Sequence, residues 1–117
     1  MSSQPRVEDY SFGHIRIDGQ DYTADVIILP DRVIADWWRE EGHSLSMDDL
    51  GAVVAAGPEV LVVGTGANGL MRVPNQTLQA LKDTGIEVIV ERTGSAWQTY
   101  NRHSQHRATA AALHLTC

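Results

Sequence analysis

The sequence predicts an α/β domain in which an N-terminal β-hairpin precedes a parallel strand–helix–strand unit. Asp18-Gly19 separates two runs of β-forming residues. This is a strong hairpin-turn signal, because both residues tolerate the positive φ angles of the favoured turns. The short apolar run 60–63 and the weakly alternating stretch 86–90 flank a helical pattern. A strand, a helix and a strand in about 30 residues make the two strands parallel, with a right-handed crossover.

The hairpin is expected to extend from Tyr10 to Leu29. Residues 26–29 are apolar at four consecutive positions, so this part is expected to be covered on both faces. Pro30 then turns the chain, and Val33-Ile34 suits another short strand.

Three helices are predicted from their boundary residues. Ser46 has the features of an N-cap, and Asp49 three residues later nearly completes a capping box. Glycine and proline are typical of helix ends and helix starts, respectively. The expected helices lie between Ser46 and Gly57, between Pro74 and Gly85, and from Thr93 onward.

The two ends of the chain are predicted differently. Residues 1–9 are polar, contain Pro5 and lack the apolar segment of a signal peptide. We expect them to form a disordered lead to a single domain over residues 10–117. Residues 108–117 are ambiguous, because their alanines suit a helix but are weak evidence against a strand.

Charge and composition exclude several classes of protein. A net charge of -6 argues against a nucleic-acid binder and against docking on an anionic membrane surface. No run of about 18 apolar residues exists, so no membrane insertion is expected. The lone Cys117 cannot form an intramolecular disulfide, which favours a reducing compartment and a cytoplasmic location.

A glycine loop follows the apolar run 60–63, at the place where α/β proteins commonly bind ligands. Its glycines, Gly64, Gly66 and Gly69, match the spacing of the dinucleotide-binding fingerprint. A dinucleotide site is disfavoured, because the next helix is expected to begin only at Pro74. A tight turn that requires positive φ angles is the alternative.

The polar residues show no catalytic pattern. None of the five histidines has the spacing of a tight metal site, no strained nucleophile elbow surrounds a serine, and no cofactor or metal is predicted. Trp37 and Trp38 lie in a segment expected to be a loop with one tryptophan packed inward. The other is a candidate for exposed apolar surface that contacts a partner.

Several segments together resemble one family of small domains. They are residues 10–13, 17–19, 22–30 with Trp38, 58–66, 99–101 and 110–113. The chain resembles the family that includes mitochondrial complex I assembly factor 3 and the adipogenesis-associated Mth-domain protein. The likeness spans about residues 10 to 117.

The resemblance implies a three-layer fold with a central, mixed, mostly parallel sheet, flanking helices and an N-terminal β element. It also implies that the tail 108–117 is a strand antiparallel to the other strands of the sheet. It implies no established enzyme activity. Relatives in mitochondria help to assemble a respiratory complex by binding other proteins.

Two hypotheses of function follow. The first is a non-catalytic interaction or assembly protein that binds an unknown protein partner through Trp37 or Trp38, as a monomer or weak homo-oligomer. The second is a protein or enzyme that binds a small anionic ligand, because a strand–loop end and a helix start both offer backbone donors. Its candidate residues are Gly64, Thr65, Gly66, Asn68, Arg72, Thr93 and Tyr100.

Overall fold

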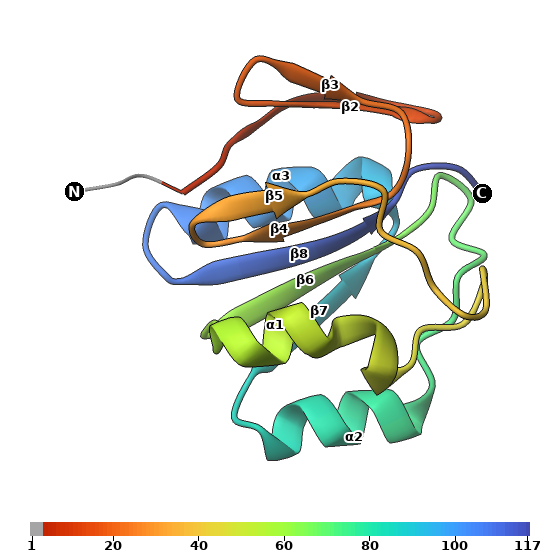
Figure 1. Cartoon of the computed structure of the whole chain (residues 1–117), viewed down its shortest axis with the longest axis vertical. Coiled ribbons are helices and arrows are strands. Elements are labelled where there is room, and N and C mark those ends of the chain that lie inside the picture. The colour runs from red at the N-terminus through yellow and green to blue at the C-terminus, as the bar shows by residue number, and fades with distance from the viewer. Residues whose placement is uncertain (1–3) are drawn as a thin grey trace.

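The chain is arranged in three layers around a five-stranded sheet (Figure 1). The computed structural model describes residues 4–117. Its central sheet has the strand order β5-β4-β8-β6-β7. These strands are Arg32–Ile34 (β5), Val26–Leu29 (β4), Thr109–His114 (β8), Val60–Thr65 (β6) and Glu87–Glu91 (β7).

The sheet is mixed and mostly parallel. β6 pairs in parallel with β7 and β8, whereas β4 pairs antiparallel with β8 and β5. β4 is therefore the one strand of this sheet that runs against the other four. The tail is a strand, as predicted, but the prediction that it runs antiparallel to the others is wrong. The helix that precedes β8 carries the chain back to the end of the sheet at which β6 begins, so β8 runs parallel to β6.

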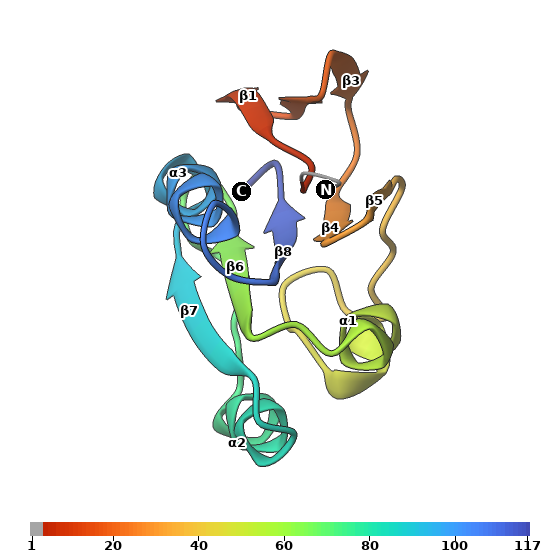
Figure 2. The same ribbon diagram turned by 90° about the vertical axis from the view of Figure 1, so that its left-hand side faces the viewer.

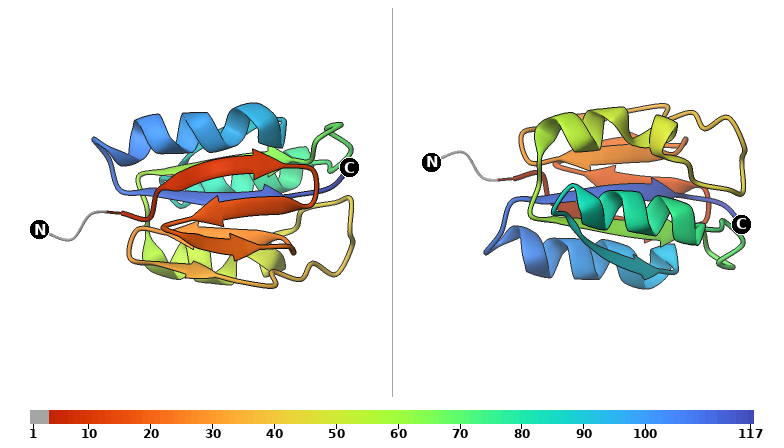
Figure 3. Two further views of the ribbon diagram at one scale, coloured as in Figure 1. Left: turned by 90° about the horizontal axis from the view of Figure 1, so that it is seen from above. Right: turned by 90° about the horizontal axis from the view of Figure 1, so that it is seen from below.

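The helices cover both faces of this sheet (Figures 2 and 3). One face carries the short helix η1, which continues into α1, together with α2. The other face carries α3 and a separate small sheet. The helices are Met47–Leu50 (η1), Gly51–Ala56 (α1), Asn75–Asp83 (α2) and Thr93–Ser104 (α3).

The predicted helix boundaries agree with the structure. Ser46 and Asp49 form a reciprocal capping box at the start of η1. Gly57 ends α1 in the left-handed conformation, at φ 60°, which glycine adopts without steric cost. Pro74 is the N-cap of α2, and α3 begins at Thr93.

The small sheet has three antiparallel strands in the order β1-β2-β3. They are Val7–Ser11 (β1), His14–Ile17 (β2) and Gln20–Tyr22 (β3). The Asp18-Gly19 turn between β2 and β3 has positive φ angles at both residues, as the sequence predicts.

The N-terminal segment departs from two predictions. The expected hairpin strand that ended at Leu29 is divided, because β3 ends at Tyr22 and β4 belongs to the central sheet. The expected disordered lead is also wrong from residue 4 onward. Val7 is buried and begins β1, and the side-chain oxygen of Asn101 accepts a hydrogen bond from its amide at 3.0 Å. Residues 1–3 lie outside the described part of the chain.

Two apolar cores lie on opposite faces of the central sheet, and the alternation of strand residues divides them. Leu61 and Val63 of β6 face α1 and α2, whereas Val62 faces α3 and the small sheet. The alanines of β8 are divided in the same way, and Ala111 shares a core with the large ring of Tyr100. This arrangement explains a strand made largely of alanine, because short side chains leave room for a large neighbour from the covering layer.

Candidate functional site

The carboxyl ends of β6 and β8 meet at one end of the molecule, beside the start of α3 (Figure 1). The glycine loop begins here. The hydroxyl of Thr93 accepts a hydrogen bond from the Gly66 amide at 2.8 Å and donates one to the His114 carbonyl at 2.6 Å. Thr93 therefore ties the loop, β8 and α3 together.

The loop uses its own backbone donors for internal contacts. The Ala67 amide donates to the Thr116 carbonyl at 2.6 Å, and the Leu70 amide donates to the Cys117 carbonyl at 3.0 Å. The amides of Gly66 and Gly69 also have acceptors within the chain. Because these N–H groups are already satisfied, they offer little to an anion.

Gly66 is required by a close approach of the backbone. Its φ is 104°, and a Cβ atom there would lie 2.5 Å from the carbonyl carbon of Cys117 and 2.8 Å from the His114 ring. The tight-turn interpretation therefore accounts for this glycine without a ligand. The helix that follows begins only at Asn75, which is too late to present its N-terminus to a pyrophosphate bound at the loop.

The residues predicted to bind an anion are only partly brought together. Gly64 and Thr65 end β6, and Thr93 contacts the loop, but Thr93 is fully buried. Asn68 and Arg72 lie exposed along the same segment.

Tyr100 lies elsewhere. It is fully buried between α3 and the small sheet, and its hydroxyl donates to the Pro5 carbonyl at 2.6 Å. Burial raises the pKa of Tyr100 to about 12. Its side chain belongs to the core rather than to the loop.

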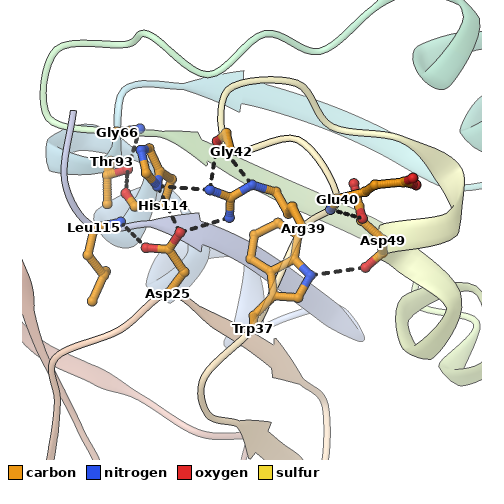
Figure 4. A network of polar contacts seen from close by, with 10 residues as sticks. All are labelled: Asp25, Trp37, Arg39, Glu40, Gly42, Asp49, Gly66, Thr93, His114 and Leu115. Atoms are coloured by element: carbon orange, nitrogen blue, oxygen red, sulfur yellow. Dashed lines mark hydrogen bonds and ion pairs between the residues drawn. The ribbon is translucent and has the colours of Figure 1, made fainter.

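A buried polar network lies beside the loop (Figure 4). One carboxylate oxygen of Asp25, Oδ2, is 2.8 Å from both Arg39 Nη1 and His114 Nδ1. The other oxygen, Oδ1, accepts the Leu115 amide at 2.7 Å. Asp25 thus joins β8 to the loop that carries Arg39, although 89 positions in the sequence separate Asp25 from His114.

Arg39 is only 7% exposed, although it lies in a surface loop. Its Nη2 donates to the Gly42 carbonyl at 2.8 Å, and the guanidinium carbon lies 4.7 Å from the centre of the Trp37 ring. Trp37 is itself fixed, since its indole N–H donates to the Asp49 carbonyl at 3.0 Å. The network therefore holds loop 36–44 against the sheet.

Asp25 is held in its ionised form. Burial raises the pKa of this carboxyl, but the hydrogen bonds from His114, the Leu115 amide and Arg39 outweigh burial and hold the pKa below its ordinary value. The ion pair with Arg39 is well shielded from solvent, with side-chain exposures of 15% and 4%.

His114 has one ring nitrogen in the network and one outside it. In the tautomer that donates Nδ1–H to Asp25, Nε2 carries the lone pair. Within residues 4–117, Nε2 is buried and has no hydrogen-bond partner. His43 lies edge-on to the ring with centroids 5.8 Å apart. An aspartate–histidine pair is thus present, but within that range no hydroxyl or thiol is bonded to Nε2, as a nucleophile–base pair requires.

The two neighbouring tryptophans point in opposite directions. Asp36 precedes them in the left-handed conformation at φ 53°, which aspartate tolerates better than most residues. Trp37 is 8% exposed and packs in the core under α1, whereas Trp38 is 78% exposed. The prediction of a loop with one tryptophan inward agrees with this arrangement. Of the two predicted partner contacts, only Trp38 lies at the surface.

Two other large apolar side chains are exposed at the same end of the molecule. Phe12 is 63% exposed in the β1–β2 turn, where the Gly13 amide donates to the Leu115 carbonyl at 2.9 Å. Leu70 is 53% exposed in the loop after β6. We call Phe12, Trp38 and Leu70 the apolar end. Figure 1 shows their three loops at the same end as the C-terminus.

The buried network was missed in the sequence, although it leaves a trace there. His114 interrupts the apolar run that ends the chain, and Asp25 directly precedes the apolar run of β4. A titratable residue inside a buried-strand pattern needs a partner. The sequence did not indicate that Arg39 supplies it, since Arg39 lies among exposed acids.

Two features are absent from the described residues. Over residues 4–117, no cluster of three or more histidine, cysteine, aspartate or glutamate side chains has the geometry to hold a metal ion. None of the helices described there is long and apolar enough to cross a membrane.

Comparisons with known proteins place these features in a family. A zebrafish (Danio rerio) protein, NADH dehydrogenase [ubiquinone] 1 alpha subcomplex assembly factor 3, is 34% identical over 111 residues. The match covers 92% of this chain but only 62% of that relative, so the chain spans less than two thirds of its length.

Solved structures show the same fold. The crystal structure of an outer membrane protein from Bartonella henselae has a TM-score of 0.84 and 24% identity, and the match covers 98% of both chains. A solution structure of a Bordetella pertussis protein described as a Mth938-like domain has a TM-score of 0.73 and 20% identity. That match covers 95% of this chain and 85% of the other.

The family model described as a protein of unknown function (DUF498/DUF598) matches residues 7–114, which is nearly the whole described chain. This span contains both sheets, α3 and the Asp25–Arg39–His114 network. The mixed α/β fold, the resemblance seen in the sequence and the family match agree, and the chain belongs to the DUF498/DUF598 family.

Proposed function

We propose that this protein is a non-catalytic interaction domain of the assembly-factor type, which binds another protein through the apolar end. The observation that carries the proposal is Trp38, which is 78% exposed beside a tryptophan that is buried. Exposed aromatic side chains are typical anchors of protein interfaces. The assembly factor named for the zebrafish relative supports the same class of function.

The loop that presents Trp38 is held in place before any partner binds. Arg39, the next residue, is fixed by Asp25 and Gly42, and Trp37 on the other side is bonded to the Asp49 carbonyl. A side chain that is presented by a rigid loop loses less entropy on binding. The buried network thus has a role in binding without chemistry of its own.

The anionic-ligand hypothesis has less support. Four amides of the glycine loop and the Thr93 hydroxyl are engaged within the chain, and Tyr100 lies in the core. Its test is a melting screen with nucleotides, phosphate and carboxylates, because a ligand that binds only the native state raises the melting temperature. A rise that Asn68→Ala or Arg72→Ala removes would favour that hypothesis over ours, because both side chains are exposed and can be shortened without a clash in the core.

The proposal is tested by capturing the tagged protein from its own cell extract and identifying stoichiometric partners by mass spectrometry. Trp38→Ala is expected to lose the partner while keeping the wild-type melting temperature. Val54→Ala is a matched control, because Val54 is an exposed apolar residue on α1, the helix that leads into the start of β6, and the apolar end lies where β6 ends. A partner that survives Trp38→Ala would count against the proposal.

We further propose that the domain acts in the cytoplasm as a monomer or weak homo-oligomer. Its charge of -6 at neutral pH supports self-repulsion between copies. Light scattering at several concentrations measures the oligomeric state. A stable dimer that Trp38→Ala dissociates would make the apolar end a self-association surface instead.

A further inference from the structure

Three acidic residues lie within three positions of the exposed tryptophan. Asp36, Glu40 and Glu41 flank Trp38 within the same loop, and all three are exposed. We call these three side chains the acidic rim. Their charge is a local feature of the surface that the proposed partner would meet.

The acidic rim is not neutralised within the described part of the chain. The ion pairs found among residues 4–117 include none that involve Asp36, Glu40 or Glu41. The one arginine of the loop, Arg39, is turned inward and paired with Asp25. The loop therefore presents its acids outward and keeps its cation inside.

The geometry points to a cationic partner. Resting on the proposed function, we propose that the segment bound at Trp38 carries lysine or arginine among apolar residues. A guanidinium or ammonium group over an indole face is attracted by the ring, and it would meet the acidic rim at the same time. The apolar stem of such a side chain would lie on the tryptophan.

The positive charge at this end of the molecule lies on another segment. Arg92 lies beside Gly69, where a Cβ would be 3.3 Å from its Cγ, and Arg72 follows Leu70 by two residues. The Arg72 amide donates to the His43 carbonyl at 2.7 Å, so Arg72 lies against the Trp38 loop. The ion pairs found among residues 4–117 join neither Arg72 nor Arg92 to the acidic rim, whose charge is therefore left for a partner.

The test uses two labelled synthetic peptides, one alternating leucine with lysine and one alternating leucine with glutamate. Fluorescence anisotropy measures their binding to the full chain at low and high salt. We expect the lysine peptide to bind and the glutamate peptide not to bind. High salt should weaken binding, since the attraction between exposed charges is screened over a Debye length of about 10 Å at 0.1 M salt, and this length shortens as salt is added.

Two triple variants with the same net charge separate local from long-range attraction. Asp36→Asn, Glu40→Gln and Glu41→Gln remove the acidic rim, and asparagine keeps the left-handed conformation of residue 36 accessible. The matched variant removes three exposed charges elsewhere: Asp9→Asn, Asp31→Asn and Asp83→Asn. Rim removal should weaken the lysine peptide about tenfold at low salt, and the matched variant less than about twofold.

The outcomes distinguish this inference from the proposed function. Equal weakening by both triple variants, or equal binding of the two peptides, would overturn the cationic partner and leave Trp38 as an anchor. If Trp38→Ala binds the lysine peptide as tightly as wild type at both salt concentrations, the anchor itself is wrong. Weakening by Trp38→Ala at both salts, together with the rim-specific loss at low salt, supports both.

Discussion

The Asp25 carboxylate accepts three hydrogen bonds from two separate segments, and its removal should be costly. Asp25→Ala deprives three buried donors of their acceptor: Arg39 Nη1, His114 Nδ1 and the Leu115 amide. Each buried donor left without an acceptor costs about 1–3 kcal/mol. Water can enter where the carboxylate was, because Asp25 is partly exposed.

We therefore expect Asp25→Ala to lower the free energy of unfolding by about 3–5 kcal/mol, as for other buried pairs that lose one partner. In a chain of this length, this corresponds to a fall in Tm of roughly 10–20 °C. Urea denaturation followed by tryptophan fluorescence measures the free energy, and a thermal scan measures Tm. Asp21→Ala is the matched control, because Asp21 also contacts a histidine and an arginine but at the surface. It should leave Tm nearly unchanged.

A double-mutant cycle tests the reason for the loss. Arg39→Met removes the buried cation and keeps most of the side-chain volume. In the Asp25→Ala background it should therefore cost less than it does alone, with a coupling free energy of about 1–3 kcal/mol. Strictly additive losses, or a loss below about 1 kcal/mol for Asp25→Ala, would refute the reasoning that an uncompensated buried charge dominates.

The same carboxylate sets the response to acid. The pKa of Asp25 lies below its ordinary value of 3.8 in the folded protein. Its contribution to stability is therefore complete above that ordinary value and lost as pH falls through the lower, folded pKa. The free-energy curves of wild type and Asp25→Ala should converge toward acidic pH, and curves that stay parallel below pH 3.8 would contradict this assignment.

Two further predictions concern the loop and the core. Gly66→Ala should lower the free energy of unfolding in urea by about 2–5 kcal/mol, because the new Cβ would lie 2.5 Å from Cys117 and the backbone is left-handed. Gly94→Ala is the control, since a Cβ there has open space around it and should not lower this free energy. The pKa of Tyr100 is raised by burial to about 12, so its contribution is present below the ordinary value of 10.0 and lost as pH rises through about 12. Burial also raises the pKa of Tyr10. An ultraviolet titration of tyrosinate should show a last-ionising group near pH 12 that Tyr100→Phe removes, and its absence from the wild type would contradict the buried assignment.

The sequence predicted those elements whose cause is local. The Asp18-Gly19 turn, the capping box at Ser46 and the helix start at Pro74 each depend on a few neighbouring residues. The buried strand Val60–Thr65 shows itself by consecutive apolar positions. Such features can be read from a window of the chain.

The missed features have causes far away in the chain. The break after Tyr22 separates two sheets, and Asp25 in that break bonds to residues about 90 positions later. The sequence predicts Val7 to lie in a disordered lead, because its partner, Asn101, is 94 residues away. No local pattern encodes such pairs.

The candidate site divides in the same way. The sequence by itself determined that tryptophans stand together in a loop, that one of them would be exposed, and that the chain carries net negative charge. Tertiary structure alone decided that Trp38 is the exposed tryptophan and that the charge of Arg39 is neutralised by its ion pair with Asp25. It also gave the glycine loop acceptors from residues near the C-terminus. The physical reason is that burial and hydrogen-bond partners depend on which segments meet in space.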